Sequence, residues 1–357
     1  MRTTRGWVSH GTTELRRAEL RRRELRADDV AVRIDYCGVC HSDLHAVHAH
    51  DPDSSVPLVP GHEFTGTVTE VGRDVRNLAV GDAVAVGNIV DACLACDMCR
   101  AGQENFCRAF PTLTYGGVDR RDGTPTSGAF AREYVVREGF AYRLPRGLDP
   151  AAAAPLMCAG VTVWEPLRAL GVGPGTRIAV IGLGGLGHLA VKLAVALGAE
   201  TTVVSRSADK ADDARRLGAQ HLIVSTDEAA MTGARGQFDV VLDTIAVAHD
   251  LAPYLALLAL DGELSLLGYL GQVSVETTDL LIGRKKLSSG GSGGRTRTAE
   301  LLEFCAERGV VADIELLPSS RAGESLERLA RGDVRYRFVL DMSDLDAGPA
   351  PVVPVRG

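Results

Sequence analysis

The segment IAVIGLGGLGHLAVKLAVALGA, residues 178–199, joins an apolar run to a cluster of glycines and a second apolar run. It is long enough and apolar enough to span a membrane. However, the four glycines near its start, followed by His188 and Lys192, favour a strand, a tight turn and a helix over residues 184–197. We therefore predict a strand–turn–helix unit and no membrane association.

The glycines of this unit follow the pattern Gly-x-Gly-x-x-Gly directly after the predicted strand RIAVI, residues 177–181. Such glycines allow a tight turn and a close approach of the backbone to a ligand, and the helix N-terminus presents unpaired N–H groups to a pyrophosphate. The pattern is weak by itself, but its place between a strand and a helix predicts dinucleotide binding. The turn residues expected to contact the cofactor are Gly182, Gly184, Gly185, Leu186 and Gly187.

The end of the next predicted strand indicates which dinucleotide is bound. About twenty residues beyond the glycines, an NAD-binding protein places Asp or Glu to bind the ribose 2′-hydroxyl. This chain has Ser205, Arg206 and Ser207 there, with Lys210 following. A carboxylate would repel a 2′-phosphate, whereas hydroxyls and cations bind one. We therefore predict NADP(H) rather than NAD(H).

Two parts of the chain differ in their hydrophobic pattern, which predicts two domains. Up to about residue 155, short alternating runs such as TGTVTEVG and GDAVAVG indicate short antiparallel strands. From about residue 176, strands alternate with helices, which is typical of a parallel, doubly wound sheet. A helix in TAELLEFCAERG and a strand in YRFVL are predicted towards the C-terminus. The predicted fold class is therefore α/β, with a β-rich domain beside the doubly wound one.

Composition and charge exclude several classes of protein. With 357 residues, of which 45% are hydrophobic and 24% charged, the chain is an ordinary globular protein of two domains by length. A net charge of −7 argues against nucleic-acid binding. The polar, arginine-rich N-terminus does not resemble a secretory signal, so we expect a cytoplasmic protein. The arginine run at residues 16–26 is interleaved with glutamates and predicts a solvated strand or helix face rather than a phosphate-binding arm.

Four of the eight cysteines lie within CLACDMCRAGQENFC, residues 93–107. A disulfide knot is typical of small secreted proteins, and this chain is neither small nor cysteine-rich. Four thiolates can instead close a tetrahedron around zinc, which leaves no position for substrate and so indicates a structural site. An iron–sulfur cluster and an unmetallated loop are the alternatives, although ferredoxin-type runs space their fourth cysteine more closely. The four ligands would be Cys93, Cys96, Cys99 and Cys107.

A second set of metal-capable residues lies far apart in the sequence and comprises Cys40, His62, Glu63 and Cys158. Each residue alone carries little information, because a buried cysteine is usually a small apolar side chain and a loop histidine is usually solvated. Two cysteines and a histidine together offer three ligands and leave a fourth position for water or substrate, as in catalytic zinc sites.

Taken in chain order, the second set, the four-cysteine loop and the glycine turn resemble the zinc-dependent medium-chain alcohol dehydrogenases, most of all the cinnamyl alcohol dehydrogenase branch with its bacterial NADP-dependent aldehyde reductases. The resemblance rests on GVCHSDLH, PLVPGHEFTGTVTEVG, the four-cysteine loop, APLMCAGVTVWEPL, GLGGLGHLAVKLA and DVRYRFVLDM. It implies a GroES-like catalytic domain made of residues 1–158 and 296–357, and a Rossmann NADP-binding domain at residues 159–295. The active site would lie in the cleft between these domains.

The resemblance also implies roles for single residues. The ligands of the catalytic zinc would be Cys40, His62, Cys158 and, as an alternating fourth ligand, Glu63. Asp43 would orient His62, as carboxylates beside zinc ligands usually do. Ser42 would pass the alcohol proton through the cofactor ribose to His45, and His41 would contact the pyrophosphate. The zinc ion would polarise the substrate oxygen while the nicotinamide carries the hydride.

Two departures from the family's pattern concern the substrate. Asp51 and Pro52 stand where relatives usually place an apolar residue, often a Trp-Gly pair, and Asp53 lies just beyond. Residues 289–293 read SGGSG in place of a loop with two apolar residues. A pocket with less apolar wall and more carboxylates would favour polar or cationic substrates. Alternatively, Asp51 and Asp53 cap a turn that Pro52 shapes.

These patterns together predict an NADP-dependent zinc alcohol dehydrogenase that acts mainly as an aldehyde reductase and binds two zinc ions per chain. Reduction of an imine or of an amine-bearing aldehyde is an alternative. An alternative of another class is a non-catalytic NADP(H) sensor, but a sensor would be expected to lose a zinc ligand or Ser42, and this chain has lost neither. Relatives often dimerise through an edge of the cofactor domain, so we expect a homodimer, although the edge segment LSSGGS at residues 287–292 is weak as a strand.

Overall fold

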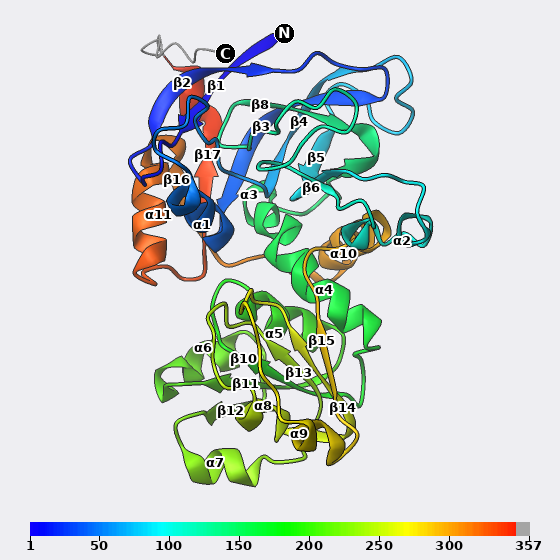
Figure 1. The fold of residues 1–357 in the computed structure, drawn as a ribbon, viewed down its shortest axis with the longest axis vertical. Helices are drawn as coiled ribbons and strands as arrows, with labels where there is room; N and C mark the ends of the chain where they lie inside the picture. The colour runs from blue at the N-terminus through cyan, green and yellow to red at the C-terminus, as the bar shows by residue number, and fades with distance from the viewer. Residues whose placement is uncertain (348–357) are drawn as a thin grey trace. The chain divides into compact units, whose positions relative to one another are not determined.

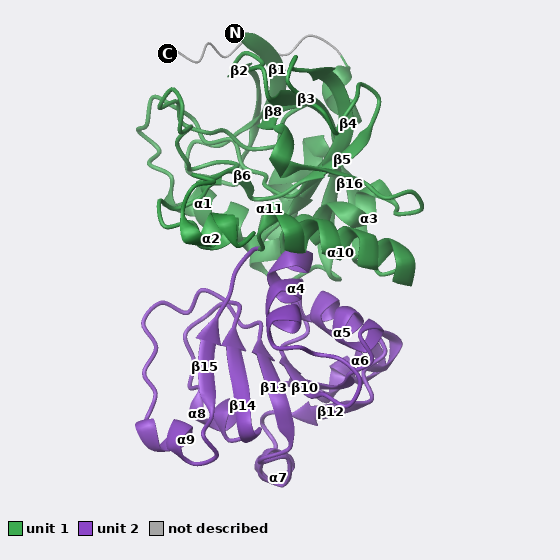
Figure 2. Ribbon diagram, turned by 90° about the vertical axis from the view of Figure 1, so that its right-hand side faces the viewer, with its two compact units in different colours: residues 1–158, 293–357 green, residues 159–292 purple. Residues whose placement is uncertain are grey.

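The computed structural model describes residues 1–347. The chain forms two compact units: unit 1 comprises residues 1–158 and the segment from residue 293 onwards, and unit 2 comprises residues 159–292 (Figure 2). The division falls after residue 292, whereas the sequence predicts a boundary after residue 295. Residues 348–357 of the predicted catalytic domain lie outside the described residues. That unit 1 is catalytic and unit 2 binds NADP(H) stays a prediction.

Unit 2 is built on a six-stranded sheet in the order β12-β11-β10-β13-β14-β15 (Figure 1). Each neighbouring pair of strands is parallel, so the predicted doubly wound α/β sheet is confirmed. Its strands are β10 (Arg177–Ile181), β11 (Glu200–Ser205), β12 (His221–Val224), β13 (Phe238–Asp243), β14 (Leu258–Leu266) and β15 (Lys286–Ser289). Its helices are α4 (Ala159–Ala169), α5 (Gly187–Ala196), α6 (Ala211–Arg216), α7 (Glu228–Gly233), α8 (Ala252–Leu255) and α9 (Thr277–Leu281).

The apolar segment at residues 178–199 forms β10, a turn and α5, as predicted. Residues 178–181 are buried because the sheet has helices on its faces, and this burial accounts for the unbroken apolar run. The helix begins at Gly187 rather than at residue 184, because the chain uses residues 183–186 to leave the strand. Within the described part of the chain, no helix is long and apolar enough to cross a membrane.

Unit 1 contains a seven-stranded sheet, with β16-β17-β3-β4-β5-β9 in order and β8 paired to β3. All its pairs are antiparallel except β16 with β17. Its main strands are β3 (Asp29–Val39), β4 (Phe64–Val71), β5 (Ala83–Val86), β8 (Glu133–Arg137), β9 (Ala141–Arg143), β16 (Ile314–Pro318) and β17 (Arg337–Asp341). Two further pairs are β1 (Arg2–Val8) with β2 (Arg16–Arg22), and β6 (Ile89–Asp91) with β7 (Thr112–Leu113).

The helices of unit 1 are α1 (His41–Ala49), α2 (Asp97–Arg100), α3 (Pro150–Ala153), α10 (Arg295–Arg308) and α11 (Ala322–Ala330). Strand β3 lies at the centre, because it pairs with β4, β8 and β17. Phe338 in β17 lies opposite Val39 in β3. The C-terminal part of the chain therefore completes a sheet that the N-terminal part begins.

The arginine run forms β2, and the predicted solvated face is present along most of it. Ala18 and Leu20 point into the core while the residues between them are exposed. Arg22 is an exception, because its buried guanidinium donates to the carbonyl oxygens of Gly128 at 2.5 Å and Glu133 at 3.0 Å. Arg22 therefore supports the neighbouring backbone from inside the protein.

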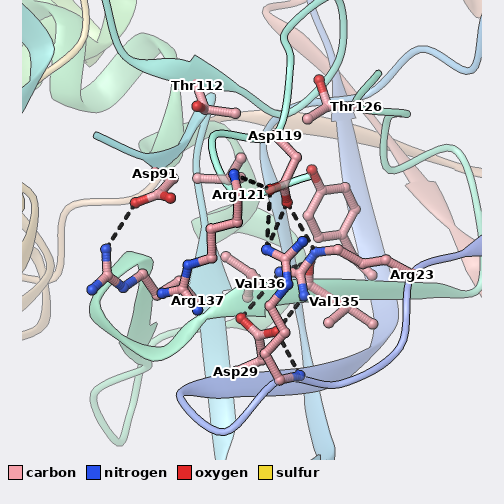
Figure 3. A pocket seen from close by; sticks show the side chains of 13 residues that line it. Arg23, Asp29, Asp91, Thr112, Asp119, Arg121, Thr126, Val135, Val136 and Arg137 are labelled. Carbon is pink, nitrogen blue, oxygen red and sulfur yellow. Dashed lines mark hydrogen bonds and ion pairs between the residues drawn. The ribbon is translucent and has the colours of Figure 1, made fainter. Parts of the chain in front are cut away.

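A small cavity of about 40 Å³ beside this hairpin is lined by arginines and aspartates (Figure 3). Each arginine there meets a carboxylate: Arg23 and Arg26 pair with Asp119 at 3.5 and 2.9 Å, and Arg121 pairs with Asp28 at 2.5 Å. The walls carry four arginines and three aspartates, and Asp28 beside the cavity is the fourth carboxylate, so every arginine is paired and no unpaired positive charge is left for an anion. We interpret the cluster as a structural network that joins segments distant in sequence.

We predict that Asp28→Asn lowers the free energy of unfolding at neutral pH by about 1 kcal/mol, a value reduced for solvent screening. The hydrogen bond from Arg121 lowers the pKa of Asp28 to about 2. A carboxylate with a lowered folded-state pKa stabilises the protein above its unfolded-state pKa, and this contribution disappears as the pH falls towards about 2. Urea unfolding of variant and wild type at several pH values measures the difference. Asp212→Asn is the control, because the Asp212 side chain is 96% exposed; equal losses for the two variants would contradict the prediction.

Candidate metal and cofactor sites

The turn from β3 into α1 places the first candidate ligand. Cys40 precedes the helix, and its backbone N–H donates to Asp43 Oδ2 at 2.9 Å. This capping arrangement turns Asp43 into the protein, where it is fully buried. His41, Ser42 and His45 lie on the exposed side of the same helix. The start of α1 therefore places Cys40 and Asp43 inside the protein, and it places His41, Ser42 and His45 where they can contact solvent or a ligand.

Cys40, His62 and Cys158 come together from three separate elements, and their ligand atoms all lie within 4.8 Å of one another. The two sulfur atoms of Cys40 and Cys158 are 3.9 Å apart, and His62 Nε2 is 3.2 Å from Cys158 Sγ. Two sulfurs bound tetrahedrally to zinc at about 2.3 Å would be about 3.8 Å apart. The donor types and their spacing therefore fit a zinc ion with one position left for another ligand.

The buried carboxylate of Asp43 holds this group in place. Its Oδ1 atom accepts the N–H of Gly61 at 2.8 Å and lies 3.0 Å from His62 Nδ1. With the proton of His62 on Nδ1, the lone pair of Nε2 points towards the two cysteines. The hydrogen bond with Cys158 lowers the pKa of Cys40 well below its usual value, which favours the thiolate that a metal needs.

Glu63, the predicted alternating ligand, is buried beside this group but pairs with another residue. Its Oε1 atom accepts a hydrogen bond from the buried guanidinium of Arg337. Burial raises the pKa of Glu63 to about 7. A Cβ atom at position 38 would lie 2.5 Å from Glu63 Oε1, so glycine is required at Gly38. The structure thus brings three of the four predicted ligands together and places Glu63 against Arg337.

Two residues near the site are absent from the sequence-based prediction. Arg337 could have been noticed as a charged residue at the start of the otherwise apolar strand YRFVL. Tyr115 gave no such signal, yet its ring lies edge-on to His62 with the centroids 5.7 Å apart. Burial raises the pKa of Tyr115, so its hydroxyl stays protonated.

The four predicted cysteines of the 93–107 loop also gather into one group, with their sulfur atoms within 4.8 Å of one another. Cys93 Sγ and Cys99 Sγ are 3.8 Å apart, and none of the eight cysteines, which all lie within the described residues, forms a disulfide. Backbone N–H groups, first that of Arg108, lower the pKa of Cys96 to about 6. Four sulfurs at this spacing fit a closed tetrahedral zinc site.

The four-cysteine loop is fastened to the first turn of α10. The buried carboxylate of Glu104 accepts the backbone N–H of Arg295 at 2.8 Å and its Nε–H at 2.7 Å. A Cβ atom on Gly294 would lie 2.0 Å from the carbonyl oxygen of Gly102, so only glycine permits this approach. The loop is therefore anchored both at the start of a helix and at its sulfur cluster.

The glycine turn in unit 2 is shaped as a dinucleotide-binding turn requires. Gly182 has a φ of +87°, and a Cβ atom on Gly187 would lie 2.1 Å from the carbonyl oxygen of Gly182. Gly184 is exposed, and a Cβ atom there would meet nothing. With Gly185 and Leu186 partly exposed beside it, the turn offers free backbone in front of α5.

The predicted 2′-phosphate residues follow the neighbouring strand. Strand β11 ends at Ser205, and Val204 pairs with Ile181, so this end lies beside the start of the glycine turn. Arg206 is exposed, and Lys210 is partly exposed in the turn that follows. Ser207 Oγ accepts the N–H of Asp209 at 3.1 Å, so part of its hydrogen-bonding capacity serves the backbone.

Asp51 has a structural use. Its Oδ1 atom accepts the N–H of Asp53 at 3.0 Å, and Ser54 N–H donates to the carbonyl oxygen of Asp51 at 3.1 Å. Asp51, Pro52 and Asp53 are all exposed. The turn-capping hypothesis therefore accounts for Asp51, and no contact in the described structure directs either carboxylate to a substrate.

Comparison with known proteins gives consistent matches along the chain. Residues 26–146 match the alcohol dehydrogenase GroES-like domain, and residues 185–307 match the zinc-binding dehydrogenase domain. A probable formaldehyde dehydrogenase, AdhA, of Bacillus subtilis is 42% identical over 95% of this chain and 97% of its own length. The NADP-dependent alcohol dehydrogenase C 1 of Mycolicibacterium smegmatis is 46% identical, with coverage of 89% and 91%.

Solved structures agree with these matches. A cinnamyl alcohol dehydrogenase of Sorghum bicolor superposes with a TM-score of 0.92 at 38% identity, covering 98% of this chain and 99% of that one. The protein CAD of Helicobacter pylori, solved in complex with NADP(H), gives a TM-score of 0.87 at 31% identity, covering 95% and 98%. The chain therefore belongs to the zinc-binding alcohol dehydrogenases with a GroES-like domain, the medium-chain family that includes the cinnamyl alcohol dehydrogenases.

Proposed function

We propose that the protein transfers a hydride between NADP(H) and an alcohol–aldehyde pair, and that it works mainly as an aldehyde reductase. The observation that carries the proposal is the Cys40–His62–Cys158 group, whose ligand atoms lie within 4.8 Å and whose histidine is oriented by Asp43. A group of three ligands leaves room for a substrate oxygen, whereas the four-cysteine group does not. The aldehyde-reducing direction and the preference for NADP(H) belong to the proposal.

Each residue of the first site has a proposed task. Cys40, His62 and Cys158 would hold the metal, and Glu63 is the candidate for an alternating fourth ligand. When bound, zinc supplies a Lewis acid that polarises the substrate oxygen, and NADPH supplies the hydride. Asp43 would keep the ring of His62 in the tautomer that leaves Nε2 free.

A proton must reach the substrate oxygen when an aldehyde becomes an alcohol. Ser42 and His45 are three positions apart on the exposed side of α1, so both side chains lie on one face of the helix. We propose that Ser42 donates the proton and that His45 replenishes it from solvent. General acid catalysis of this kind contributes about 100-fold or more to a rate.

The cofactor would lie along the carboxyl ends of the strands of unit 2, as in other doubly wound sheets. Gly182, Gly184, Gly185, Leu186 and Gly187 would contact its pyrophosphate, together with His41. Candidates for the 2′-phosphate are Ser205, Arg206, Ser207 and Lys210. Two relatives support NADP(H): one is named as NADP-dependent, and one was solved with NADP(H).

The proposal extends to assembly and location. A homodimer would use the free edge of β15, which pairs on its other side with β14. The strand ends at Ser289, so the glycine-rich residues that follow do not lengthen this edge. A cytoplasmic location is consistent with eight free thiols.

We predict that the purified protein oxidises NADPH when given an aldehyde, and that Ser42→Ala lowers kcat about 100-fold. Absorbance at the nicotinamide band follows the reaction, and elemental analysis checks that zinc content is unchanged. Ser320→Ala, an exposed serine outside the site, is the matched control. No turnover of any aldehyde by zinc-loaded wild type would contradict the proposal, and an unaffected Ser42→Ala would remove Ser42 from the mechanism.

We predict that Arg206→Glu lowers kcat/KM for NADPH by about 100-fold, because loss of a charged hydrogen bond and addition of a repelling carboxylate each cost about 1 to 3 kcal/mol. The value for NADH should fall far less, since NADH lacks the 2′-phosphate. Initial-rate kinetics with both cofactors measure the ratio. The control is Arg177→Glu, which makes the same charge change at the first residue of β10. Arg206 instead follows the last residue of β11, at the other end of the parallel strands, so the control should leave the NADPH-to-NADH ratio unchanged. Equal losses with both cofactors would contradict the assignment.

We predict that Cys99→Ser lowers the zinc content from two ions per chain to one and lowers the melting temperature. Cys99 is a buried member of the four-cysteine group, and a structural zinc site contributes several kcal/mol to folding. Mass spectrometry of the native protein counts the ions. Cys305→Ala, a buried cysteine of α10 outside both groups, should keep two. Two ions in Cys99→Ser would disprove the assignment.

A further inference from the structure

Asp243 is a buried carboxylate in unit 2 that the proposed reaction does not use. It is the last residue of β13, lies opposite Ile181 at the end of β10, and is fully buried. Its Oδ1 atom accepts the N–H of Ile245 at 3.0 Å. Its Oδ2 atom lies 2.8 Å from Nε2 of His249, whose side chain is 17% exposed. A carboxylate in this position needs a compensating charge or a proton.

The surroundings of His249 require a proton between these two groups. Nδ1 of the ring lies 2.8 Å from the carbonyl oxygen of Val247, which can only accept, so Nδ1 must carry a hydrogen. In a neutral ring Nε2 would then carry no hydrogen. Neither Nε2 nor Asp243 Oδ2 has an ordinary hydrogen-bond partner among the described residues. An unprotonated nitrogen and a carboxylate oxygen only 2.8 Å apart repel each other, so we infer that the pair holds one extra proton, as an imidazolium beside a carboxylate or as a neutral acid beside the ring.

Other charged groups near the ring are few within the described structure. The ring of Tyr254, in α8, lies edge-on to His249 with the centroids 5.6 Å apart. Burial raises the pKa of Tyr254, and its electrostatic neighbours include Asp243, Asp250 and Arg206. Of these, Arg206 is the proposed 2′-phosphate residue, so this group of side chains extends towards the cofactor positions.

The connection from residue 244 to residue 250 is the part of the chain that this pair supports. Thr244 Oγ1 donates to the carbonyl oxygen of Ile181 at 2.7 Å, immediately before the glycine turn. On the other side, a Cβ atom on Gly268 would lie 2.0 Å from the carbonyl oxygen of Ile245, so the end of β14 approaches closely. Between these contacts Val247 is 67% exposed at the carboxyl edge of the sheet, where a dinucleotide binds.

We propose that His249 is a cofactor-positioning residue, which holds the 244–250 connection in its nucleotide-binding shape only while it shares a proton with Asp243. The inference rests on the proposed dinucleotide-binding function and deepens it. His249 does not contact the reacting atoms; it acts through the backbone of the connection. Without that proton two acceptor atoms would lie 2.8 Å apart, which would loosen the connection and weaken cofactor binding.

The test compares dissociation constants for NADPH, measured by nicotinamide fluorescence, from about pH 6 to about pH 9, on either side of the usual histidine range. Asp243→Asn keeps Oδ1 for Ile245 and gives neutral His249 an amide donor, so binding no longer needs the proton. We expect wild type and Asp243→Asn to bind alike at the acidic end, and wild type to bind about tenfold more weakly at the alkaline end. The ratio of the two proteins cancels the titration of the cofactor phosphates and of His41.

His249→Phe keeps a ring against Tyr254 but has no N–H group, so it should bind NADPH about tenfold more weakly than wild type even at the acidic end. Its kcat at saturating NADPH should change less than about twofold, because only binding is affected. His221→Asn is the matched control. His221 is the first residue of β12, whereas Asp243 is the last residue of β13, so the two lie at opposite ends of the parallel strands. The His221 side chain is 63% exposed. This control should bind as wild type does.

The outcomes separate the inference from the proposed function. Wild-type pH dependence in Asp243→Asn, or wild-type affinity in His249→Phe, overturns the role of His249 while leaving the dehydrogenase function in place. If His249→Phe does not fold, the ratio of Asp243→Asn to wild type decides alone. A wild type that binds neither NADPH nor NADH overturns both.

Discussion

The arrangement of the first metal site depends on one buried carboxylate. Asp43 accepts the N–H of Cys40 and of Gly61 and faces Nδ1 of His62. These contacts join the start of α1 to the segment before β4, and they fix which nitrogen of His62 is free. A carboxylate without its hydrogen-bond partners would be costly to bury, so the fold and the ligand geometry stabilise each other. The geometry of the proposed metal ligands therefore depends on Asp43, a residue that is not itself a ligand.

Local patterns in the sequence were sufficient to predict much of the structure. The glycine turn and the four-cysteine loop are each contained in a short segment, and the strand–helix alternation after residue 176 follows from hydrophobic period. Arg22, Tyr115 and Arg337 contact partners far along the chain, and the folding of unit 1 brings these partners together. Their contacts could not be predicted from spacing, because strand pairing and loop packing rather than distance in sequence decide which side chains meet. The start of α5 was also misplaced, since the turn consumes residues that the helical pattern had included.

The two metal-capable groups illustrate how burial separates roles. Beside the three-ligand group, Glu63 and Arg337 are both buried and form an ion pair. In the four-cysteine group, the backbone N–H groups of Cys96 and Cys99 donate to the sulfur atoms of Cys93 and Cys96.

The bond between Glu104 and Arg295 links residues that are 191 positions apart. It connects the loop bearing the four thiols to the helix that begins just after the chain leaves unit 2 at residue 292. Oxidative damage to a sulfur of that loop would therefore not stay local, because the misshapen loop would withdraw the carboxylate from the first turn of α10. A lesion at residue 96 would be transmitted to the segment through which the inserted unit rejoins the rest of the polypeptide.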